Sequence, residues 1–328
     1  MPWRSSALAL LVVLGAVACS SSTPSGGAAP AASEKTNAED SGSPTGSSGG
    51  TTPTPQTDGG SSPDGATQPP AIAFPAKWSD GTACGTDPDL QTFQITPDTF
   101  ILRQSLCTTF EGPFMYLFVG STKALLVDTG TGGVDLKGKV TGLLAGKTVQ
   151  LVVAHSHSHG DHVNGDPAFK NQPSTTVVGT SVTAVGQFFG ISGDAAAAYD
   201  LGGRVIDVLP IPGHQAAHLA YYDRETKLLL TGDTLYPGRL YIDDWNAYRA
   251  SVPQLVAFVD AGHPVSYMLG GHIELPKTGA DYAFGAQVHA NEHVLQLGDA
   301  ELRELGAAVK AMGNTPKHEV HSAFIISP

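Results

Sequence analysis

The sequence predicts a folded domain of the α+β class over residues 72–328. Short runs of β-branched, aromatic and leucine residues alternate there with turn residues, which is typical of strands. Longer segments repeat apolar residues at the spacing of a helix face. In addition, an apolar run at 148–154 leads directly into four histidines and an aspartate. Polar groups that follow a buried strand predict a functional site at that end of the sheet.

The expected strands lie at residues 99–106, 114–119, 123–127, 148–154, 175–178, 205–210, 218–222, 227–230 and 265–269. The strand at 148–154 shows almost no alternation, so we expect it to be buried on both faces. Residues 181–199 and 280–312 are expected to be mostly helical, and residues 245–260 to form an amphipathic helix. His289, Glu292 and His293 could bind a metal, but we interpret them as an exposed helix face.

The histidine tract runs from His155 to His162. Only Asp161 is followed directly by a histidine, so the register is His157-x-His159-x-Asp161-His162. Imidazole suits zinc and related cations, and two ligand pairs in so short a span predict two adjacent metal ions. The alternative is a tract that binds metal without a defined site. His155 does not fit this register, so we expect its side chain to hydrogen-bond to another group and not to bind a metal ion directly.

Three later segments offer the missing ligands at the ends of predicted strands. His214 follows Pro212-Gly213 and is the expected third ligand of the first metal ion. Asp233 follows a glycine that lets the backbone approach closely, and a carboxylate can bridge two cations. His272 is the expected third ligand of the second ion, whereas His218 is interpreted as structural. Asp128 either points toward the tract as a supporting group or is a plain turn residue.

Residues 1–19 have the pattern of an export signal, with Arg4 followed by a small and apolar stretch. The stretch ends in Ala16-Val17-Ala18-Cys19, which resembles a bacterial lipoprotein signal in which Cys19 receives the lipid. An ordinary secretory signal is the alternative. We therefore expect an exported lipoprotein that is anchored to a bacterial membrane only through Cys19, facing the periplasm or the cell surface.

Residues 20–71 contain almost only Ser, Gly, Thr, Pro, Ala and polar residues, and segments of this kind cannot bury enough apolar surface to fold. We expect a disordered linker. If Cys19 carries a lipid, Cys84 and Cys107 remain, and two thiols in an oxidising compartment can form a disulfide. Two free buried thiols are the alternative.

The formal net charge of the chain is -12, and no cluster of Lys and Arg occurs. Binding to nucleic acid depends on such clusters, so the sequence disfavours a nucleic-acid partner. A small molecule is the expected substrate.

Taken in order, the segments Asp128-Thr-Gly, His157-x-His159-x-Asp161-His162, Pro212-Gly213-His214, Gly232-Asp233 and Gly271-His272 resemble the metallo-β-lactamase-fold superfamily. The resemblance covers roughly residues 95 to 275 and implies a four-layer αβ/βα sandwich with a binuclear metal site at one sheet edge. It implies that the first ion is held by His157, His159 and His214. The second ion is held by Asp161, His162 and His272, and Asp233 bridges the two.

Within the superfamily, the chain resembles glyoxalase-II-type thioesterases and N-acyl homoserine lactonases more than true β-lactamases. The reasons are the presence of Asp233 and the absence of any cysteine beyond residue 107. Tyr236 stands where the lactonases place a tyrosine near the substrate carbonyl, and Gly271-His272-Ile273-Glu274 is similar to their motif. A convincing set of glutathione-binding residues is not evident in the C-terminal part.

The resemblance implies a hydrolase with two Zn²⁺ ions, or iron or manganese in their place. A hydroxide shared by the two ions would cleave an ester, thioester, lactone or lactam. Asp161 would orient this nucleophile, and Tyr236 would help to polarise the carbonyl. The alternatives are a mononuclear iron enzyme that oxidises persulfides, a true β-lactamase, and a metal-binding protein without catalytic activity.

Overall fold

The computed structural model describes residues 72–328, which contain two six-stranded sheets and one three-stranded sheet. The first sheet consists of β1 (Leu90–Thr96), β2 (Thr99–Gln104), β3 (Phe114–Val119), β4 (Lys123–Val127), β5 (Gln150–Ala154) and β6 (Thr175–Val177). Its strands lie in chain order; β1 to β4 pair antiparallel, whereas β4, β5 and β6 pair parallel.

The second sheet runs in nearly the opposite order, β13-β12-β10-β9-β8-β7. Its strands are β7 (Ala197–Asp200), β8 (Val205–Pro210), β9 (Leu219–Asp223), β10 (Leu228–Gly232), β12 (Tyr267–Gly270) and β13 (Gln296–Leu297). Only β10 and β12 pair parallel in this sheet. The small third sheet joins β11 (Arg239–Tyr241), β15 (Ile325–Ser327) and β14 (Glu319–Val320).

The two large sheets pack face to face, because alternate residues of their strands contribute to one shared core. In β3, Phe114, Tyr116 and Phe118 lie in this core together with Ile206, Val208, Leu219 and Tyr221 of the second sheet. The residues between them, such as Leu117, belong to a second core on the outer face of the first sheet. Both faces of the central strands are therefore buried, which explains their continuous apolar sequences.

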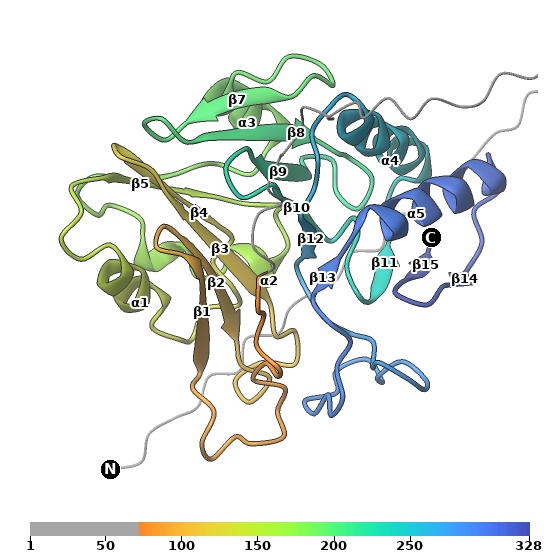
Figure 1. Cartoon of the computed structure of the whole chain (residues 1–328), viewed down its shortest axis with the longest axis horizontal. Coiled ribbons are helices and arrows are strands. Elements are labelled where there is room, and N and C mark those ends of the chain that lie inside the picture. Colours follow the sequence, from red (N-terminus) through yellow and green to blue (C-terminus); the bar gives the residue numbers. More distant parts are fainter. Residues whose placement is uncertain (1–71) are drawn as a thin grey trace, which may run out of the picture. The chain divides into compact units, whose positions relative to one another are not determined.

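Helices cover the outer face of each large sheet. The helices are α1 (Leu136–Leu143), α2 (Gly160–Val163), α3 (Val182–Phe189), α4 (Trp245–Asp260) and α5 (Asp299–Met312), with a 3₁₀ turn η1 at Asp166–Ala168. Helix α1 contributes to the outer core of the first sheet, whereas α4 and α5 pack against the second sheet (Figure 1). The four-layer αβ/βα sandwich is thus confirmed.

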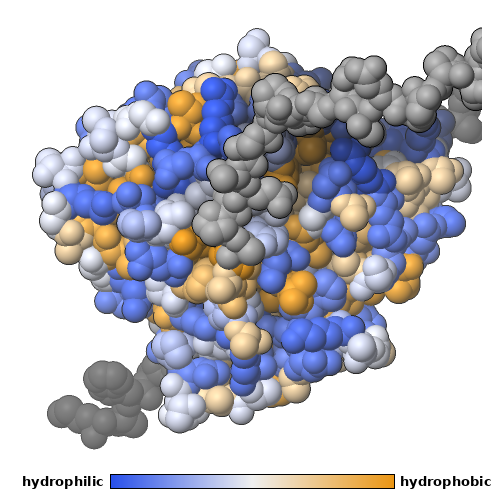
Figure 2. All heavy atoms as spheres, viewed as in Figure 1, coloured by the Kyte–Doolittle hydropathy of each residue, from blue (hydrophilic) through white to orange (hydrophobic). Residues whose placement is uncertain are grey.

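The surface of this sandwich mixes polar and apolar residues, and hydrophilic and hydrophobic side chains are interspersed on the face shown in Figure 2. Among residues 72–328, no helix is both long enough and apolar enough to span a bilayer. The predicted lipidated Cys19, the signal at residues 1–19 and the linker at residues 20–71 lie outside the described residues.

Most predicted strands are confirmed, and the amphipathic helix is found as α4 with the predicted bounds. Its start is fixed by Asp244, whose side chain accepts a hydrogen bond from the amide of Ala247 at 3.0 Å. The structure adds β1, α1 and the three-stranded sheet, which the sequence pattern does not predict.

The prediction for residues 181–199 is wrong in its second half. The helix α3 ends at Gly190, which has φ +74°, a conformation that favours glycine. The chain then forms β7, where Ala197 pairs with Val208 of β8. Hydrogen bonds to a neighbouring strand outweigh the helix preference of the alanine run 195–198.

The predicted helix at 280–312 is also wrong in its first half, because only α5 is helical and residues 280–295 form a loop. His289 and Glu292 are buried, which contradicts the exposed helix face expected for them. The ring of Tyr282 stacks on His289 with centroids 4.1 Å apart, and Glu292 forms a buried ion pair with Arg103 of β2. The ion pair joins residues 189 positions apart in the sequence, so periodicity could not predict it.

The expected disulfide between Cys84 and Cys107 is confirmed. It connects an exposed turn to the segment between β2 and β3, which also carries Phe110 and Glu111. The two cysteines are 23 residues apart in the sequence.

Replacement of both cysteines, Cys84→Ser with Cys107→Ser, should lower the free energy of unfolding by about 3 kcal/mol, because the unfolded chain loses a cross-link of this loop length. Urea unfolding of the oxidised protein and of the double variant measures the difference. Reduced wild-type protein is the control and should behave like the variant. Equal midpoints for all three would show that the cross-link does not stabilise the fold.

Candidate metal centre

Seven potential ligands from different parts of the chain meet where the two large sheets face each other. The histidine tract leaves the end of β5 and continues into α2, and the other three ligands follow β8, β10 and β12 of the second sheet. The ligands form two groups, His157, His159 and His214, and Asp161, His162, Asp233 and His272. The structure thus brings together all seven predicted residues, and their role as metal ligands stays a prediction.

The first group is a nearly equilateral triangle of ring nitrogens. His157 Nε2 lies 3.0 Å from His159 Nδ1, and His214 Nε2 lies 3.1 Å and 3.0 Å from these two atoms. The centre of such a triangle is about 1.8 Å from each corner, so an ion just outside its plane can reach the Zn–N distance of about 2.0–2.1 Å.

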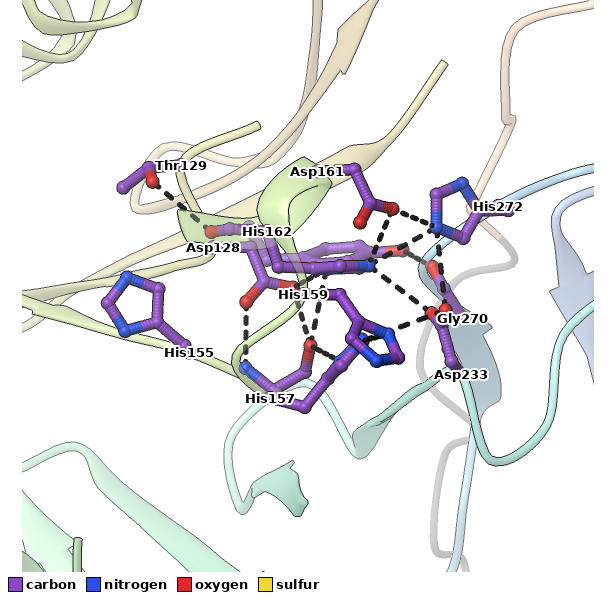
Figure 3. Close-up of polar contacts among 12 residues, drawn as sticks. Asp128, Thr129, His155, His157, His159, Asp161, His162, Asp233, Gly270 and His272 are labelled. Carbon is purple, nitrogen blue, oxygen red and sulfur yellow. Dashed lines mark hydrogen bonds and ion pairs between the residues drawn. The ribbon is translucent and has the colours of Figure 1, made fainter. Parts of the chain in front are cut away.

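The second group has the same size but includes a carboxylate. Asp161 Oδ2 lies 3.1 Å from His162 Nε2 and 3.0 Å from His272 Nε2, and the two nitrogens are 3.2 Å apart. Figure 3 shows these three side chains pointing toward one another. His159 and Asp161 are half-buried whereas His157, His162, His214 and His272 are buried, so the centre opens to solvent on the side of the first two.

Asp233 lies between the two groups. Its Oδ2 atom is 3.6 Å from His214 Nε2, 3.9 Å from His157 Nε2 and 3.6 Å from His272 Nε2, while Oδ1 is 3.5 Å from His162 Nε2. The side chain is buried, and Oδ1 has no hydrogen-bond partner among the described residues. A buried carboxylate oxygen without a partner is costly unless a cation compensates it, so this placement suits a ligand shared by two ions.

Backbone carbonyls fix which ring nitrogen of two histidines faces the centre. The Nδ1 atom of His214 is 2.7 Å from the carbonyl of Tyr241, and that of His272 is 2.9 Å from the carbonyl of Glu111. A carbonyl can only accept, so each Nδ1 carries a proton and each Nε2 is the nitrogen that can offer a lone pair to a cation at the centre. Lone pairs that face one another need a cation between them, and the donor set therefore fits a metal ion.

Asp128 also holds a ligand imidazole in place. This agrees with the first of the two predictions for this residue, a supporting group rather than a plain turn residue. Its Oδ2 atom accepts from His162 Nδ1 at 2.8 Å, and its Oδ1 atom accepts from the amide of Ser156 at 2.7 Å. Asp128 is buried and has φ +68°, an uncommon conformation for a residue with a side chain. The residue therefore holds both the ring of His162 and the start of the tract in place.

Two glycines let the strand ends approach the ligands. A Cβ atom on Gly232, which has φ +48°, would lie 2.7 Å from the ring of His218 and 2.8 Å from the Cβ of Ser156. A Cβ atom on Gly271 would lie 2.4 Å from Asp233 Oδ1. The close approach predicted for Gly232 is thus confirmed, and Gly271 has the same function.

The two remaining histidines of these segments belong to neither ligand group. His155 Nε2 lies 2.8 Å from Asp166 Oδ1, and Figure 3 shows its ring turned away from the centre. His218 Nε2 accepts a hydrogen bond from the amide of Asp233 at 3.1 Å, and its ring stacks on His157. Both side chains are structural in this arrangement, as expected.

Among the side chains alone, the two groups differ in their preferred charge. Burial lowers the pKa of His157 well below its usual range, and the neighbouring imidazoles add to this effect. Burial also acts against the charged form of His272, but Asp233 and Asp161 outweigh it and raise the pKa of His272 to about 10. Without a metal ion, His157 thus favours the neutral imidazole, whereas His272 favours the cationic form beside the two carboxylates.

Tyr236 is buried, and its hydroxyl donates to the carbonyl of Arg239 and lies 3.2 Å from Glu274 Oε2. Its ring centroid is 5.6 Å from that of His272. Sequence reasoning missed Glu111 and Tyr241, which hold ligand imidazoles through their carbonyls. Backbone contacts of this kind leave no signal in the sequence, because any residue type can provide a carbonyl.

Comparison with known proteins agrees with this architecture. The family model of the metallo-beta-lactamase superfamily matches residues 108–272, which is half of the chain. The matched segment begins shortly before β3 and ends at His272, so it contains all seven ligands.

The chain is also similar to two hydroxyacylglutathione hydrolases. The protein of Dechloromonas aromatica (strain RCB) is 27% identical over 212 residues, which are 63% of this chain and 74% of that protein. The protein of Rhizobium meliloti (strain 1021) is 31% identical over 113 residues, which are 32% of this chain and 43% of that protein. The second match thus spans less than half of the relative.

Among solved structures, a metallo-beta-lactamase from Pontibacter korlensis is similar at 18% identity with a TM-score of 0.46. The similarity covers 67% of this chain and 99% of that one. From the match to half of its residues, this chain belongs to the metallo-beta-lactamase superfamily.

Proposed function

We propose that this chain is a metal-dependent hydrolase that holds two Zn²⁺ ions and cleaves an ester, thioester, lactone or lactam. The observation that carries the proposal is the pair of ligand triangles with edges of 3.0–3.2 Å and Asp233 between them. A centre for a single ion would need neither the second triangle nor a shared carboxylate. Iron or manganese in place of zinc is an outcome of the test below.

Each residue of the centre would have a distinct role in hydrolysis. When bound, two such ions supply a water of lowered pKa and polarise a carbonyl. Asp161 is half-buried at the open side, so its carboxylate can orient the attacking water as well as bind. The buried rings of His157 and His162 keep bulk water away from the inner side. Asp128 holds His162 in the orientation that this requires.

The name of the similar hydroxyacylglutathione hydrolases describes hydrolysis of a thioester, which is one of the four bonds in the proposal. We infer that acyl transfer to water is the reaction class of this chain, and that the acyl compound is a small molecule. The similarity to these relatives supports the class but covers less than half of one of them.

Metal analysis of the protein purified without added metal tests the proposal. We expect about two zinc ions per chain, no visible absorbance, and hydrolysis of at least one member of a panel of thioesters, esters, lactones and β-lactams. About one iron per chain with a visible band would instead indicate an oxidoreductase. Tight retention of zinc without hydrolysis of any member would indicate a metal-binding protein.

Tyr236→Phe separates a catalytic role of this hydroxyl from a structural one. If the hydroxyl polarises the carbonyl, kcat/KM should fall about 100-fold, as for the loss of one oxyanion donor. The lost hydrogen bond to the carbonyl of Arg239 should lower the unfolding free energy by about 1 kcal/mol in either case. Lower stability with unchanged kcat/KM on every active substrate would show that the Tyr236 hydroxyl has a structural role and no catalytic one.

We further propose that the protein is exported and anchored to a membrane by a lipid on Cys19. The disulfide between Cys84 and Cys107 supports an oxidising compartment. Expression of the full chain and of Cys19→Ser, followed by membrane fractionation, tests the anchor. The wild type should sediment with membranes and the variant should not; release of both into the soluble fraction would contradict the proposal.

A further inference from the structure

The substrate of the centre is constrained by the side chains around its open side. Three segments supply them: the segment between β2 and β3 with Phe110 and Glu111, the strand β11 with Arg239 and Tyr241, and the loop that follows His272. Phe110, Glu111, Arg239, Glu274 and Phe284 line one small cleft. We refer to these five residues with Tyr241 as the rim.

The rim adjoins both ligand groups. Its backbone contacts the centre on each side, since Glu111 holds His272 and Tyr241 holds His214 through their carbonyls. Glu274 is two residues beyond His272. A substrate that reaches the centre from this side therefore extends past these side chains.

The negative charge of the rim is not compensated by an available cation. Arg239 is the one Lys or Arg that lines the cleft, and its guanidinium already forms ion pairs with Asp281 and Glu274. Its Nε atom donates to Asp281 at 2.9 Å, another nitrogen donates to the carbonyl of Tyr282, and Nη1 lies 3.6 Å from Glu274 Oε2. A carboxylate on the substrate would have to displace these partners to reach the guanidinium.

Glu111 adds a second carboxylate that has no hydrogen bond or ion pair to its side chain among residues 72–328. The backbone carbonyl of Glu111 is 2.9 Å from His272 Nδ1, so the residue stands directly beside the second ligand group. Like charges at such a rim disfavour an anionic substrate.

The apolar side chains of the rim are unusually exposed. Phe110 and Phe284 contact each other edge to face with centroids 5.6 Å apart, although they come from segments far apart in the sequence. Phe284 is 75% exposed, Tyr241 is 40% exposed and Phe110 is 36% exposed. Exposed aromatic side chains beside a catalytic opening offer a surface for an apolar group.

From this rim we propose that the substrate is an uncharged, apolar acyl compound, and that Glu111 selects against thioesters of glutathione, which carry two carboxylates. The acyl chain would lie against Phe110 and Phe284. The inference rests on the proposed hydrolase function, and it separates this chain from the relatives whose name specifies glutathione.

Two thioesters with the same acyl group test the inference on the zinc-loaded full chain. S-butyryl-N-acetylcysteamine has an uncharged thiol part, whereas S-butyrylglutathione has an anionic one. We expect kcat/KM to be at least tenfold higher for the uncharged thioester. Glu111→Gln should narrow this ratio several-fold, and Phe284→Ala should raise KM for the uncharged thioester. Glu225→Gln, at an exposed turn, is the matched control and should leave the ratio unchanged.

Binding of thioethers that cannot be hydrolysed gives a second readout that does not depend on catalysis. In calorimetric titrations, S-hexyl-N-acetylcysteamine should bind about tenfold more tightly than S-hexylglutathione, and Glu111→Gln should reduce the difference. Equal affinities, or a preference for glutathione in both experiments, would overturn the inference and leave the hydrolase intact. Selective binding without cleavage of any thioester, ester or lactone would overturn the proposed hydrolase instead, while the selectivity of the rim would stand.

Discussion

Asp233→Asn should abolish the second metal equivalent and lower kcat/KM by more than the ~10–100-fold that loss of an outer partner of a metal ligand costs. The carboxylate of Asp233 lies within 4 Å of ring nitrogens of both triangles. Asparagine keeps the shape but loses the charge, so it can no longer compensate two cations. Metal content per chain and hydrolysis of the best substrate measure the two effects.

Two variants calibrate this result. Asp128→Asn removes the negative charge and one of the two oxygens that accept from His162 Nδ1 and the Ser156 amide, without removing a ligand, and its loss of activity should stay within ~10–100-fold. Asp260→Asn, at the exposed end of α4, should change neither metal content nor activity. If Asp233→Asn retained two zinc ions with full activity, the shared carboxylate would have no part in the centre.

Glu292→Gln should have the largest effect on stability and lower the free energy of unfolding by about 3–5 kcal/mol, because it leaves the buried cation of Arg103 without its partner. The guanidinium donates to both carboxylate oxygens of Glu292, at 2.6 and 2.5 Å, and Arg103 is fully buried. Its Nε atom has only the carbonyl of Gly112 in addition, at 3.3 Å. Urea unfolding with an unchanged slope would isolate the change in stability.

The matched control for Glu292→Gln is Lys147→Gln. Lys147 forms an exposed ion pair with Asp98 at 2.6 Å, and pairs of this kind contribute less than about 1 kcal/mol. A comparable loss of stability in both variants would show that burial of the pair with Arg103 is unimportant. A large loss of stability in Glu292→Gln alone would establish that the ion pair with Arg103 holds the loop at 276–295 against the first sheet.

The sequence was most informative where the ligands follow a strand directly. Four of the seven ligands lie within the tract from His157 to His162, and the other three follow a glycine at a strand end. Local spacing and turn chemistry specify such positions, so the sequence alone predicts which residues form each ligand group. The buried strands were equally clear, because their apolar runs reflect burial on both faces.

The sequence was least informative where long-range contacts determine the conformation. Residues 280–295 have helical spacing, but the pair of Glu292 with Arg103 and the stacking of His289 on Tyr282 hold them in a loop. The direction of the Tyr236 hydroxyl also depends on distant Glu274. No periodic pattern reports contacts of this kind, and tertiary packing overrides local preference.

The order of the strands has a consequence for how the centre is assembled during folding. In both six-stranded sheets most neighbours in space are also neighbours along the chain, so each half can form through contacts of short sequence separation. The remaining ligands join the tract at residues 157–162 only once the second sheet docks onto the first. A metal ion captured early by the tract would therefore have an incomplete coordination shell. Separation of the two halves would therefore divide both ligand groups even if the strands within each sheet stayed paired.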